Sequence, residues 1–206
     1  MVQKEGFVGQ LKRVIINDGH MGPKEIGCDT YFLEWLTDAI LNGGGAIVDF
    51  GCYGANLITA LTKGEKPISV TAVTRSFKPD VYPKVDDDAT IIISYPKFQC
   101  IIQASWNWPF DRKDMEIYGE TGYIKVDNKK EMRIKGSRES AEDKIEVSDT
   151  DIAVYTDPFA YFFDVINEKI NMAPYSLYSL ENNLRVVELL DLARASAKTG
   201  ETKYFK

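Results

Sequence analysis

The chain has 206 residues, of which 44% are hydrophobic, 27% are charged and 12% are aromatic, a composition typical of a globular domain and not of a disordered segment. Its formal net charge is −6, so general nucleic-acid binding is not expected. The longest apolar runs are too short to cross a bilayer, and residues 1–13 contain no apolar leader segment. The composition therefore predicts a globular protein that binds neither nucleic acid nor membrane.

Cysteine and histidine are scarce, which limits the chemistry open to the chain. The three cysteines, Cys28, Cys52 and Cys100, cannot all pair and show no C-x-x-C spacing. The single histidine, His20, leaves almost no material for a histidine-based catalytic triad or metal cluster. We therefore expect a reducing, cytoplasmic compartment and no metal site.

The first half of the chain mixes strand and helix patterns. In chain order it is predicted to contain a strand over 11–16, a glycine-rich loop over 19–29, a helix over 31–41, a helix over 46–62 and a strand over 68–77. Asp29 or Thr30 is expected to cap the first helix, and Gly64 to end the second. The triple glycine at 43–45 separates the two helices.

The second half is predicted to be a run of strands followed by two helices. The strands are expected over 89–95, 99–108, 115–118, 123–126, 131–134 and 144–147, and the helices from Asp157–Pro158 and over 179–198. The apolar side chains of the first of these helices are expected to face the core: Phe159, Phe162, Phe163, Val165 and Ile166. The fold class is α+β, one large and predominantly antiparallel sheet with helices on one face.

Residues 43–56, GGGAIVDFGCYGAN, form the one segment whose residue types and spacing suggest a catalytic or binding site. On a continuous helix, Asp49, Tyr53 and Asn56 share one face, and a carboxylate or phenol on a buried face needs partners. Gly51 and Gly54 weaken that helix, which indicates a close approach to its backbone. The amides of the triple glycine suit an anion or a carbonyl oxygen. The alternative is a tightly packed core helix, with Asp49 as a structural acceptor and Tyr53 as a core aromatic.

This segment resembles the G-G-G-x-x-x-D-x-G-x-[HY] motif of the Gfo/Idh/MocA oxidoreductases, NAD(P)-dependent enzymes that act mostly on sugars and cyclitols. Other resemblances cover most of the chain: the spacing of Gly6, Gly9 and Val14, the position of Trp35 before the glycines, the strands over 66–73, 86–106 and 115–126, and SAKTGE near the end. The resemblance implies that residues 1–10 lead in from a nucleotide-binding domain that this chain lacks. Residues 11–206 would then form a single substrate and oligomerisation domain.

The resemblance also implies roles for individual residues. Tyr53 matches the acid/base position, as in Tyr-type members such as glucose–fructose oxidoreductase, and Asp49 matches the acidic residue that orients the acid/base group or substrate. We also predict that Asn56, His20 and Trp35 contact a sugar or polyol substrate. In the family the open face of the sheet packs on another subunit, which implies a homodimer or tetramer. Apolar positions such as Ile91, Ile93, Ile102 and Ala104 are compatible with either a core face or that interface.

The chain departs from the family pattern at the cofactor. It contains no G-x-G-x-x-G after a strand, and Glu65-Lys66-Pro67 is interpreted as a surface turn and not as the family's E-K-P motif. NAD or NADP is therefore expected in a complete enzyme, without tight binding or turnover by this chain alone and without a lysine partner for Tyr53. The alternative is a non-catalytic module that dimerises through its sheet or binds sugar weakly.

Three further sites are interpreted as structural. The alternation at Trp106 and Trp108 favours packing or a subunit contact over sugar stacking. The run Asp86–Asp88 is interpreted as a loop with a strand-start cap, because three consecutive aspartates do not converge on one ion. Cys52 has no base within motif reach and is not expected to be a nucleophile.

Overall fold

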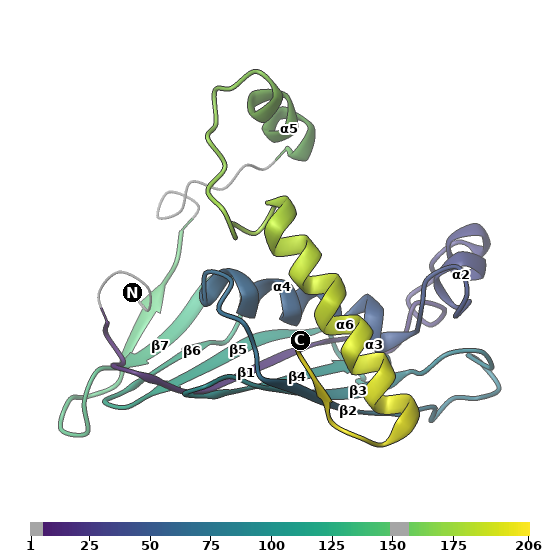
Figure 1. The fold of residues 1–206 in the computed structure, drawn as a ribbon, viewed down its shortest axis with the longest axis horizontal. Coiled ribbons are helices and arrows are strands. Elements are labelled where there is room, and N and C mark those ends of the chain that lie inside the picture. The colour runs from purple at the N-terminus through teal and green to yellow at the C-terminus, as the bar shows by residue number, and fades with distance from the viewer. Residues whose placement is uncertain (1–5, 149–156) are drawn as a thin grey trace.

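The computed structural model describes residues 6–148 and 157–206, and its centre is a nine-stranded sheet (Figure 1). In spatial order the strands are β8 (Asp143–Glu146), β7 (Glu131–Lys135), β6 (Tyr123–Val126), β5 (Arg112–Gly119), β1 (Leu11–Gly19), β4 (Gln99–Ser105), β3 (Asp88–Ser94), β2 (Ser69–Arg75) and β9 (Lys203–Tyr204). The first five residues of the predicted lead-in lie outside the described residues.

The strand pairing is antiparallel except at one place. The N-terminal strand β1 lies in the middle of the sheet, parallel to β4 on one side and antiparallel to β5 on the other. The described helices are α2 (Thr30–Leu36), α3 (Ala46–Asp49), α4 (Gly51–Leu61), α5 (Pro158–Ile166) and α6 (Leu180–Thr199), and all lie on the same side of the sheet (Figure 1). The predicted α+β fold with helices on one face is confirmed.

The core fills the space between this face of the sheet and the helices α3, α4 and α6. The isoleucines Ile91 and Ile102 lie under α4, where they come close to the backbone at Gly51 and Gly54. A Cβ atom at Gly54 would lie 2.6 Å from a methyl carbon of Ile102, so only glycine permits this approach. Four apolar positions were compatible with either a core face or a subunit interface, and they belong to the core, since all are buried: Ile91, Ile93, Ile102 and Ala104.

Two of the predicted helices have other bounds in the structure than the sequence predicts. The helix predicted over 46–62 is divided at Phe50 into α3 and α4, so Asp49 ends one helix while Tyr53 belongs to the next. The helix predicted over 31–41 ends at Leu36, because the Asp38 carboxylate accepts hydrogen bonds from the N–H groups of Ile40 and Leu41 and turns the chain there. Asp29 caps this helix, as one of the two predicted alternatives.

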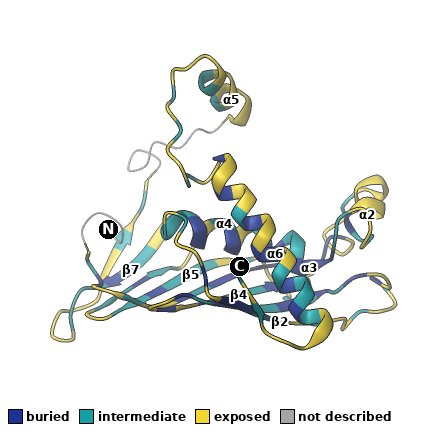
Figure 2. Ribbon diagram, in the orientation of Figure 1, coloured by how far each residue is buried: buried dark blue, intermediate teal, exposed yellow. Residues whose placement is uncertain are grey.

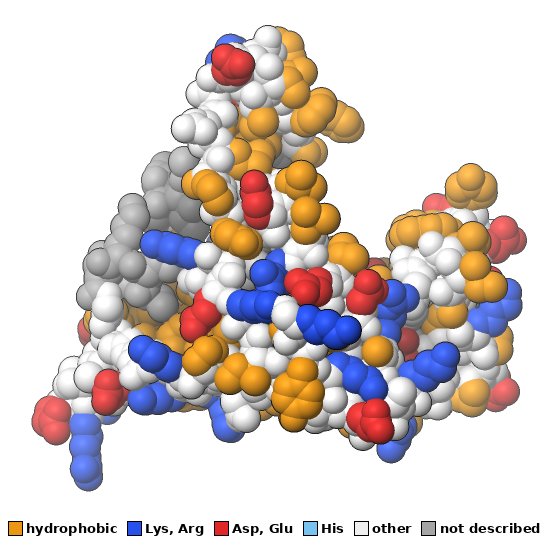
Figure 3. Space-filling model, in the orientation of Figure 1, with side chains coloured by type: hydrophobic (Ala, Val, Ile, Leu, Met, Phe, Trp, Pro, Cys, Tyr) orange, Lys and Arg blue, Asp and Glu red, His pale blue; other side chains and the backbone are white. Residues whose placement is uncertain are grey.

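The prediction for α5 is right about its start and wrong about its packing. The Asp157 carboxylate caps it by accepting from the N–H groups of Phe159 and Ala160. None of its residues is buried, however, and it projects away from the sheet (Figures 1 and 2). Its aromatic side chains form an exposed apolar group beside the exposed apolar residues at the start of α6 (Figure 3). An amphipathic pattern identifies an apolar face but not whether this chain covers it.

Two loop predictions are confirmed. Glu65 and Lys66 are exposed in the connection between α4 and β2, as expected of a surface turn. Asp86 and Asp87 lie in the loop before β3 and bond backbone N–H groups. Among the described residues no helix is long and apolar enough to span a membrane, and no group of acidic, histidine or cysteine side chains is arranged to hold a metal.

Candidate active site

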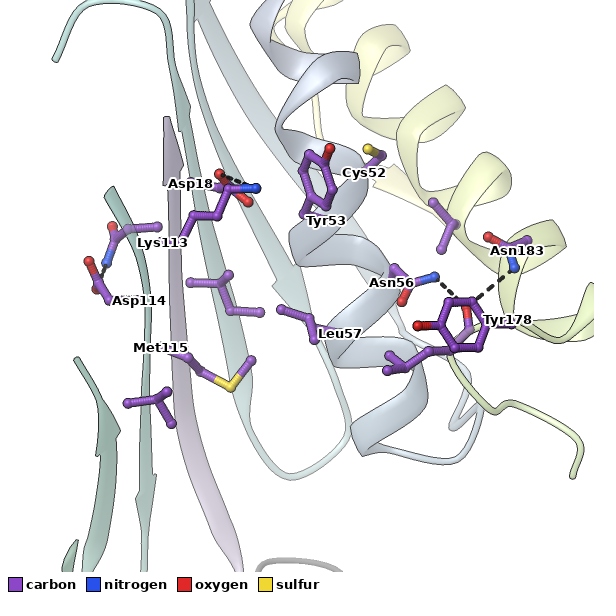
Figure 4. Close-up of a pocket in the computed structure, with 15 residues that line it drawn as sticks. Asp18, Cys52, Tyr53, Asn56, Leu57, Lys113, Asp114, Met115, Tyr178 and Asn183 are labelled. Atoms are coloured by element: carbon purple, nitrogen blue, oxygen red, sulfur yellow. Dashed lines mark hydrogen bonds and ion pairs between the residues drawn. The ribbon is translucent and has the colours of Figure 1, made fainter. Parts of the chain in front are cut away.

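Tyr53 lies where two cavities meet on the helix-covered side of the sheet. The first cavity, of about 840 Å³, is bounded by α4, β1, β5 and the segment before α6, and its lining is mostly apolar (Figure 4). The second, of about 790 Å³, is bounded by the loop after β1, by α2 and by the start of β5. Tyr53 lines both and is 46% exposed, so the interpretation of Tyr53 as a core aromatic is wrong.

Asp49 borders the second cavity and is anchored from the opposite side. Its Oδ2 accepts a hydrogen bond from the indole Nε1 of the fully buried Trp106, at 2.9 Å. Burial raises the pKa of Asp49, while this hydrogen bond and the charges of His20 and Lys113 act in the opposite direction. The carboxylate is therefore both a bonded structural acceptor and a group that lines the cavity.

His20 lines the same cavity as Asp49 and Tyr53. Its Nδ1 accepts the N–H of Gly22 at 2.9 Å, so in the neutral ring Nε2 holds the proton and is a hydrogen-bond donor. The imidazole packs edge-on against Phe50, with ring centroids 4.8 Å apart. Burial lowers the pKa of His20, which keeps the ring neutral at pH 7. The structure thus brings three of the predicted site residues together.

The other two predicted substrate contacts do not line the second cavity. Asn56 lines the first cavity, and its Nδ2 donates to the carbonyl of Leu177 at 2.9 Å (Figure 4). Trp35 packs against Phe32 in α2, with ring centroids 5.8 Å apart. Phe32 lines the second cavity, whereas Trp35 lies outside both. The structure therefore brings Asn56 to Tyr53 and leaves Trp35 apart.

The amides at the start of α3 are already bonded, which corrects the prediction of bare amides at this helix N-terminus. The Asp86 carboxylate accepts from the N–H of Gly45 at 3.0 Å and from the N–H of Ile47 at 2.7 Å, and the Asp86 carbonyl accepts from Ala46. A Cβ at Gly45 would lie 1.8 Å from that carbonyl oxygen, so the glycine is required by the contact with Asp86. These residues do not fit a pyrophosphate.

Two charged residues that the sequence analysis missed adjoin Tyr53. The ammonium of Lys113, on β5, lies 4.2 Å from the centroid of the Tyr53 ring and 3.6 Å from Oδ1 of Asp18, on β1 (Figure 4). Burial raises the pKa of Asp18 to about 6. The sequence contained a signal for Asp18, because this residue continues the two-residue alternation of Val14 and Ile16 and therefore lies on the buried face. A carboxylate is costly to bury there without a partner.

Cys52 lies beside Tyr53 in the wall of the first cavity. Its thiol donates to the carbonyl of Asp49 at 3.2 Å, and burial raises the pKa of Cys52 to about 11. The group therefore remains a thiol at neutral pH and is no nucleophile there, as predicted.

Comparison with known proteins identifies the class to which this fold and site belong. Residues 2–125 match the family model described as the GFO/IDH/MocA C-terminal domain, and the chain belongs to that family. The match includes the triple glycine, Asp49 and Tyr53. The chain is thus an oxidoreductase-family C-terminal domain, as the resemblance implied.

Individual relatives agree with this class. The chain is 42% identical over 96 residues to a trans-1,2-dihydrobenzene-1,2-diol dehydrogenase of Xenopus laevis, a match that covers 46% of this chain and 28% of that protein. Its fold is similar to that of an aldose-aldose oxidoreductase from Caulobacter crescentus (TM-score 0.75, 18% identity, 98% of this chain and 58% of the other). A levoglucosan dehydrogenase solved with NADH and levoglucosan is similar as well (TM-score 0.76, 16% identity, 98% and 60%). The chain therefore spans less than two thirds of these relatives.

Proposed function

We propose that this chain is the substrate-binding and acid/base half of an NAD(P)-dependent oxidoreductase that acts on a hydroxyl of a sugar, polyol or cyclic diol. The observation that supports this most directly is the position of Tyr53, half-exposed between two cavities and beside Asp49 and His20. In the relatives named above, related domains belong to enzymes that act on dihydrodiols and sugars.

Tyr53 is proposed to move the proton at the reacting oxygen of the substrate. Conversion between an alcohol and a carbonyl at carbon requires a proton to leave or reach that oxygen. Burial raises the pKa of Tyr53, so the phenol holds its proton at neutral pH and is ready to donate it to a carbonyl oxygen. In the opposite direction the phenolate form of Tyr53 accepts the proton of the alcohol.

Asp49 and His20 are proposed to orient the substrate around this phenol. Asp49 accepts hydrogen bonds from hydroxyl groups, while the Nε2–H of the neutral His20 donates one. Asn56 borders the apolar cavity on the other side of Tyr53. That cavity suits the carbon face of a ring, while the second cavity suits its hydroxyl groups.

The cofactor is proposed to bind to a domain outside this chain. Asp86 already accepts from the amides of Gly45, Ala46 and Ile47, so the start of α3 is not proposed as the site of the pyrophosphate. NAD(P) would exchange the hydride, and the contribution of this chain is the binding of the substrate and the proton at Tyr53. The face of the sheet away from the helices is proposed to contact a second copy of the chain.

The test is a fusion of this chain to the dinucleotide-binding domain of a family member, assayed with NADH and NADPH on sugars, polyols and cyclic diols. We expect turnover by the fusion and a loss of about 10²–10⁴ in kcat for Tyr53→Phe, because one positioned acid/base group is removed. Tyr204→Phe is the matched control, since this exposed phenol lies on β9 and lines neither cavity, so its loss should leave kcat unchanged.

The result also distinguishes the alternative of a non-catalytic module. A fusion that folds and binds cofactor but converts none of these substrates contradicts the proposal. Full activity of the Tyr53→Phe variant would show that Tyr53 is not the acid/base group.

A further inference from the structure

The register of the sheet fixes a charge pair directly under the Tyr53 ring. Asp18 on β1 and Lys113 on β5 are direct partners in the antiparallel pairing of these two strands. Directly opposed residues of this kind point to the same face of the sheet, here the face that α4 covers. Tyr53 on α4 meets the pair from above, with the Lys113 ammonium 4.2 Å from its ring centroid (Figure 4).

The Asp18 side chain is buried on the sheet, whereas the long Lys113 side chain is exposed and needs a partner to hold its ammonium in one place. The Asp18 side chain is 7% exposed, and the Lys113 side chain is 63% exposed. The carboxylate Oδ1 of Asp18 has no hydrogen-bond partner among the described residues, and the Lys113 ammonium lies 3.6 Å from it. A buried carboxylate that lacks full hydrogen bonding is costly and attracts a nearby cation.

We propose that this pair sets the acidity of Tyr53, with Lys113 as the cation that favours the phenolate and Asp18 as the positioning residue that holds Lys113 over the ring. The pair matters for catalysis only if Tyr53 exchanges protons with a substrate, so the inference rests on the proposed function. It supplies a cation for the phenol from within this chain, on a strand 60 residues after the phenol in the sequence.

The surroundings of the phenol support a specific role for Lys113. The titratable groups that face Tyr53 are Lys113 from β5, Asp18 from β1, Asp49 from α3 and the Cys52 thiol from its own helix. Burial and the three acidic groups raise the pKa of Tyr53, and Lys113 acts against them. Removal of the ammonium therefore leaves the phenol among groups that all disfavour its ionised form.

The first experiment is an NMR titration of this chain, labelled with ¹³C at the tyrosine Cζ, in which Tyr53→Phe assigns the Tyr53 signal. We expect Lys113→Met to raise the pKa of Tyr53 by about 0.5 to 1 pH unit, because the effect of an exposed charge at this distance is screened by water but not abolished. Lys113→Arg keeps a cation over the ring and is expected to stay within about 0.3 pH unit of the parent chain.

The control is Lys125→Met. Lys125 lies over the rings of Tyr118 and Tyr123 and not over Tyr53, so this substitution should shift the tyrosines of β5 and β6 and leave Tyr53 unchanged. A Tyr53 pKa that is the same in Lys113→Met and in the parent chain overturns the inference.

The second experiment tests the positioning role of Asp18. The methylene protons of a lysine held over an aromatic ring are shifted upfield, and we expect this signature for Lys113 above about pH 6, where the Asp18 carboxylate is ionised. Asp18→Asn should lose the signature at every pH, while His20→Asn should keep it together with its pH dependence. An unchanged signature in Asp18→Asn refutes the positioning role.

These experiments use no cofactor and no substrate, so they are independent of turnover. If Lys113→Met raises the Tyr53 pKa but Tyr53→Phe retains full activity in the fusion, the electrostatic pair stands and the proposed function fails. If Tyr53→Phe is inactive and Lys113→Met leaves the pKa unchanged, the proposed function stands and this inference fails.

Discussion

The two carboxylates nearest Tyr53 show how strongly their partners decide their behaviour. Burial raises the pKa of both Asp49 and Asp18. Asp49 accepts the Trp106 indole N–H, whereas Asp18 faces an ammonium across a longer distance of 3.6 Å. Asp18 is therefore the group whose ionisation costs the folded protein more than its partner returns.

This cost predicts a pH-dependent stability at Asp18. The pKa of Asp18 is about 6 in the folded chain against an ordinary 3.8, so the folded state binds the proton more tightly and gains stability as the pH falls from 7 to 4. Asp18→Asn removes that titration. At pH 8 the variant should be more stable than the parent by about 1 to 2 kcal/mol, after allowance for solvent screening, and near pH 4 the two should be equal.

Urea unfolding of both proteins at pH 4, 6 and 8 measures this difference. A variant that is less stable than its parent at pH 8 would show that the Lys113 pairing outweighs the burial of the carboxylate.

At this scale the sequence was informative where chemistry follows a local motif. Tyr53 and Asp49 were predicted from one short segment, and the structure places both at a cavity. Trp106 contacts Asp49 from 57 residues away, a contact that no local pattern reveals. Lys113 and Asp18 were missed, although the two-residue alternation of each strand places both on the buried face.

Among the elements, α4 approaches the sheet closely at a glycine. A Cβ at Gly54 would lie closer to Ile102 of β4 than real side chains do, whereas a Cβ at Gly51 would make tight contacts with Ile91 and Leu190 that a small shift of these side chains relieves. The two glycines were interpreted as signs of a close approach, and the approaching groups are core isoleucines and a leucine, not a ligand. The site depends on this contact, because α4 places Tyr53.

The contact predicts unequal effects for two identical substitutions. Gly54→Ala puts a methyl group 2.6 Å from Ile102 and should destabilise the chain by about 2 to 3 kcal/mol. Gly51→Ala is the matched control, because its nearest contacts would be 3.2 and 3.3 Å and the better helix propensity of alanine offsets most of the strain. Chemical denaturation measures both variants, and equal losses would contradict the account.

Element boundaries were less predictable than element types. Apart from the short strand β9, which was not predicted, the strands and helices were located correctly, but the break at Phe50 and the early end of α2 depend on turns and side-chain bonds. For α5 the pattern identified an apolar face without its partner. That face needs a surface to cover it, and this surface is not among the described residues.

The whole molecule presents two unlike sides, a helical side with the cavities and a bare sheet. On the bare side, Val73 and Ile92 are 53% and 37% exposed and lie on β2 and β3. Side chains alternate along a strand, so Ile92 points away from the helices that cover Ile91. Apolar groups on an open sheet face are consistent with the proposed contact between two copies.

We therefore expect the chain to form a dimer or tetramer at micromolar concentration and Val73→Lys with Ile92→Lys to make it monomeric, because two charges would be buried in the contact. Light scattering measures the mass. Phe159→Lys is the control, since it places the same charge on the exposed face of α5. A monomeric parent chain contradicts the sheet contact, and a monomeric Phe159→Lys variant would move the contact to α5.

The central position of β1 has a consequence for how the molecule is made. Among the described strands, β1 comes first in the sequence but has its two neighbours in β4 and β5, with Arg13 opposite Gln99 and Gly19 opposite Arg112. The residues of β1 lack their strand partners until more than 80 further residues have been synthesised, because Arg13 and Gln99 are 86 residues apart in the sequence. Assembly of the sheet is thus a late, long-range event, and loss of the first 19 residues would leave two half-sheets with no strand to join them.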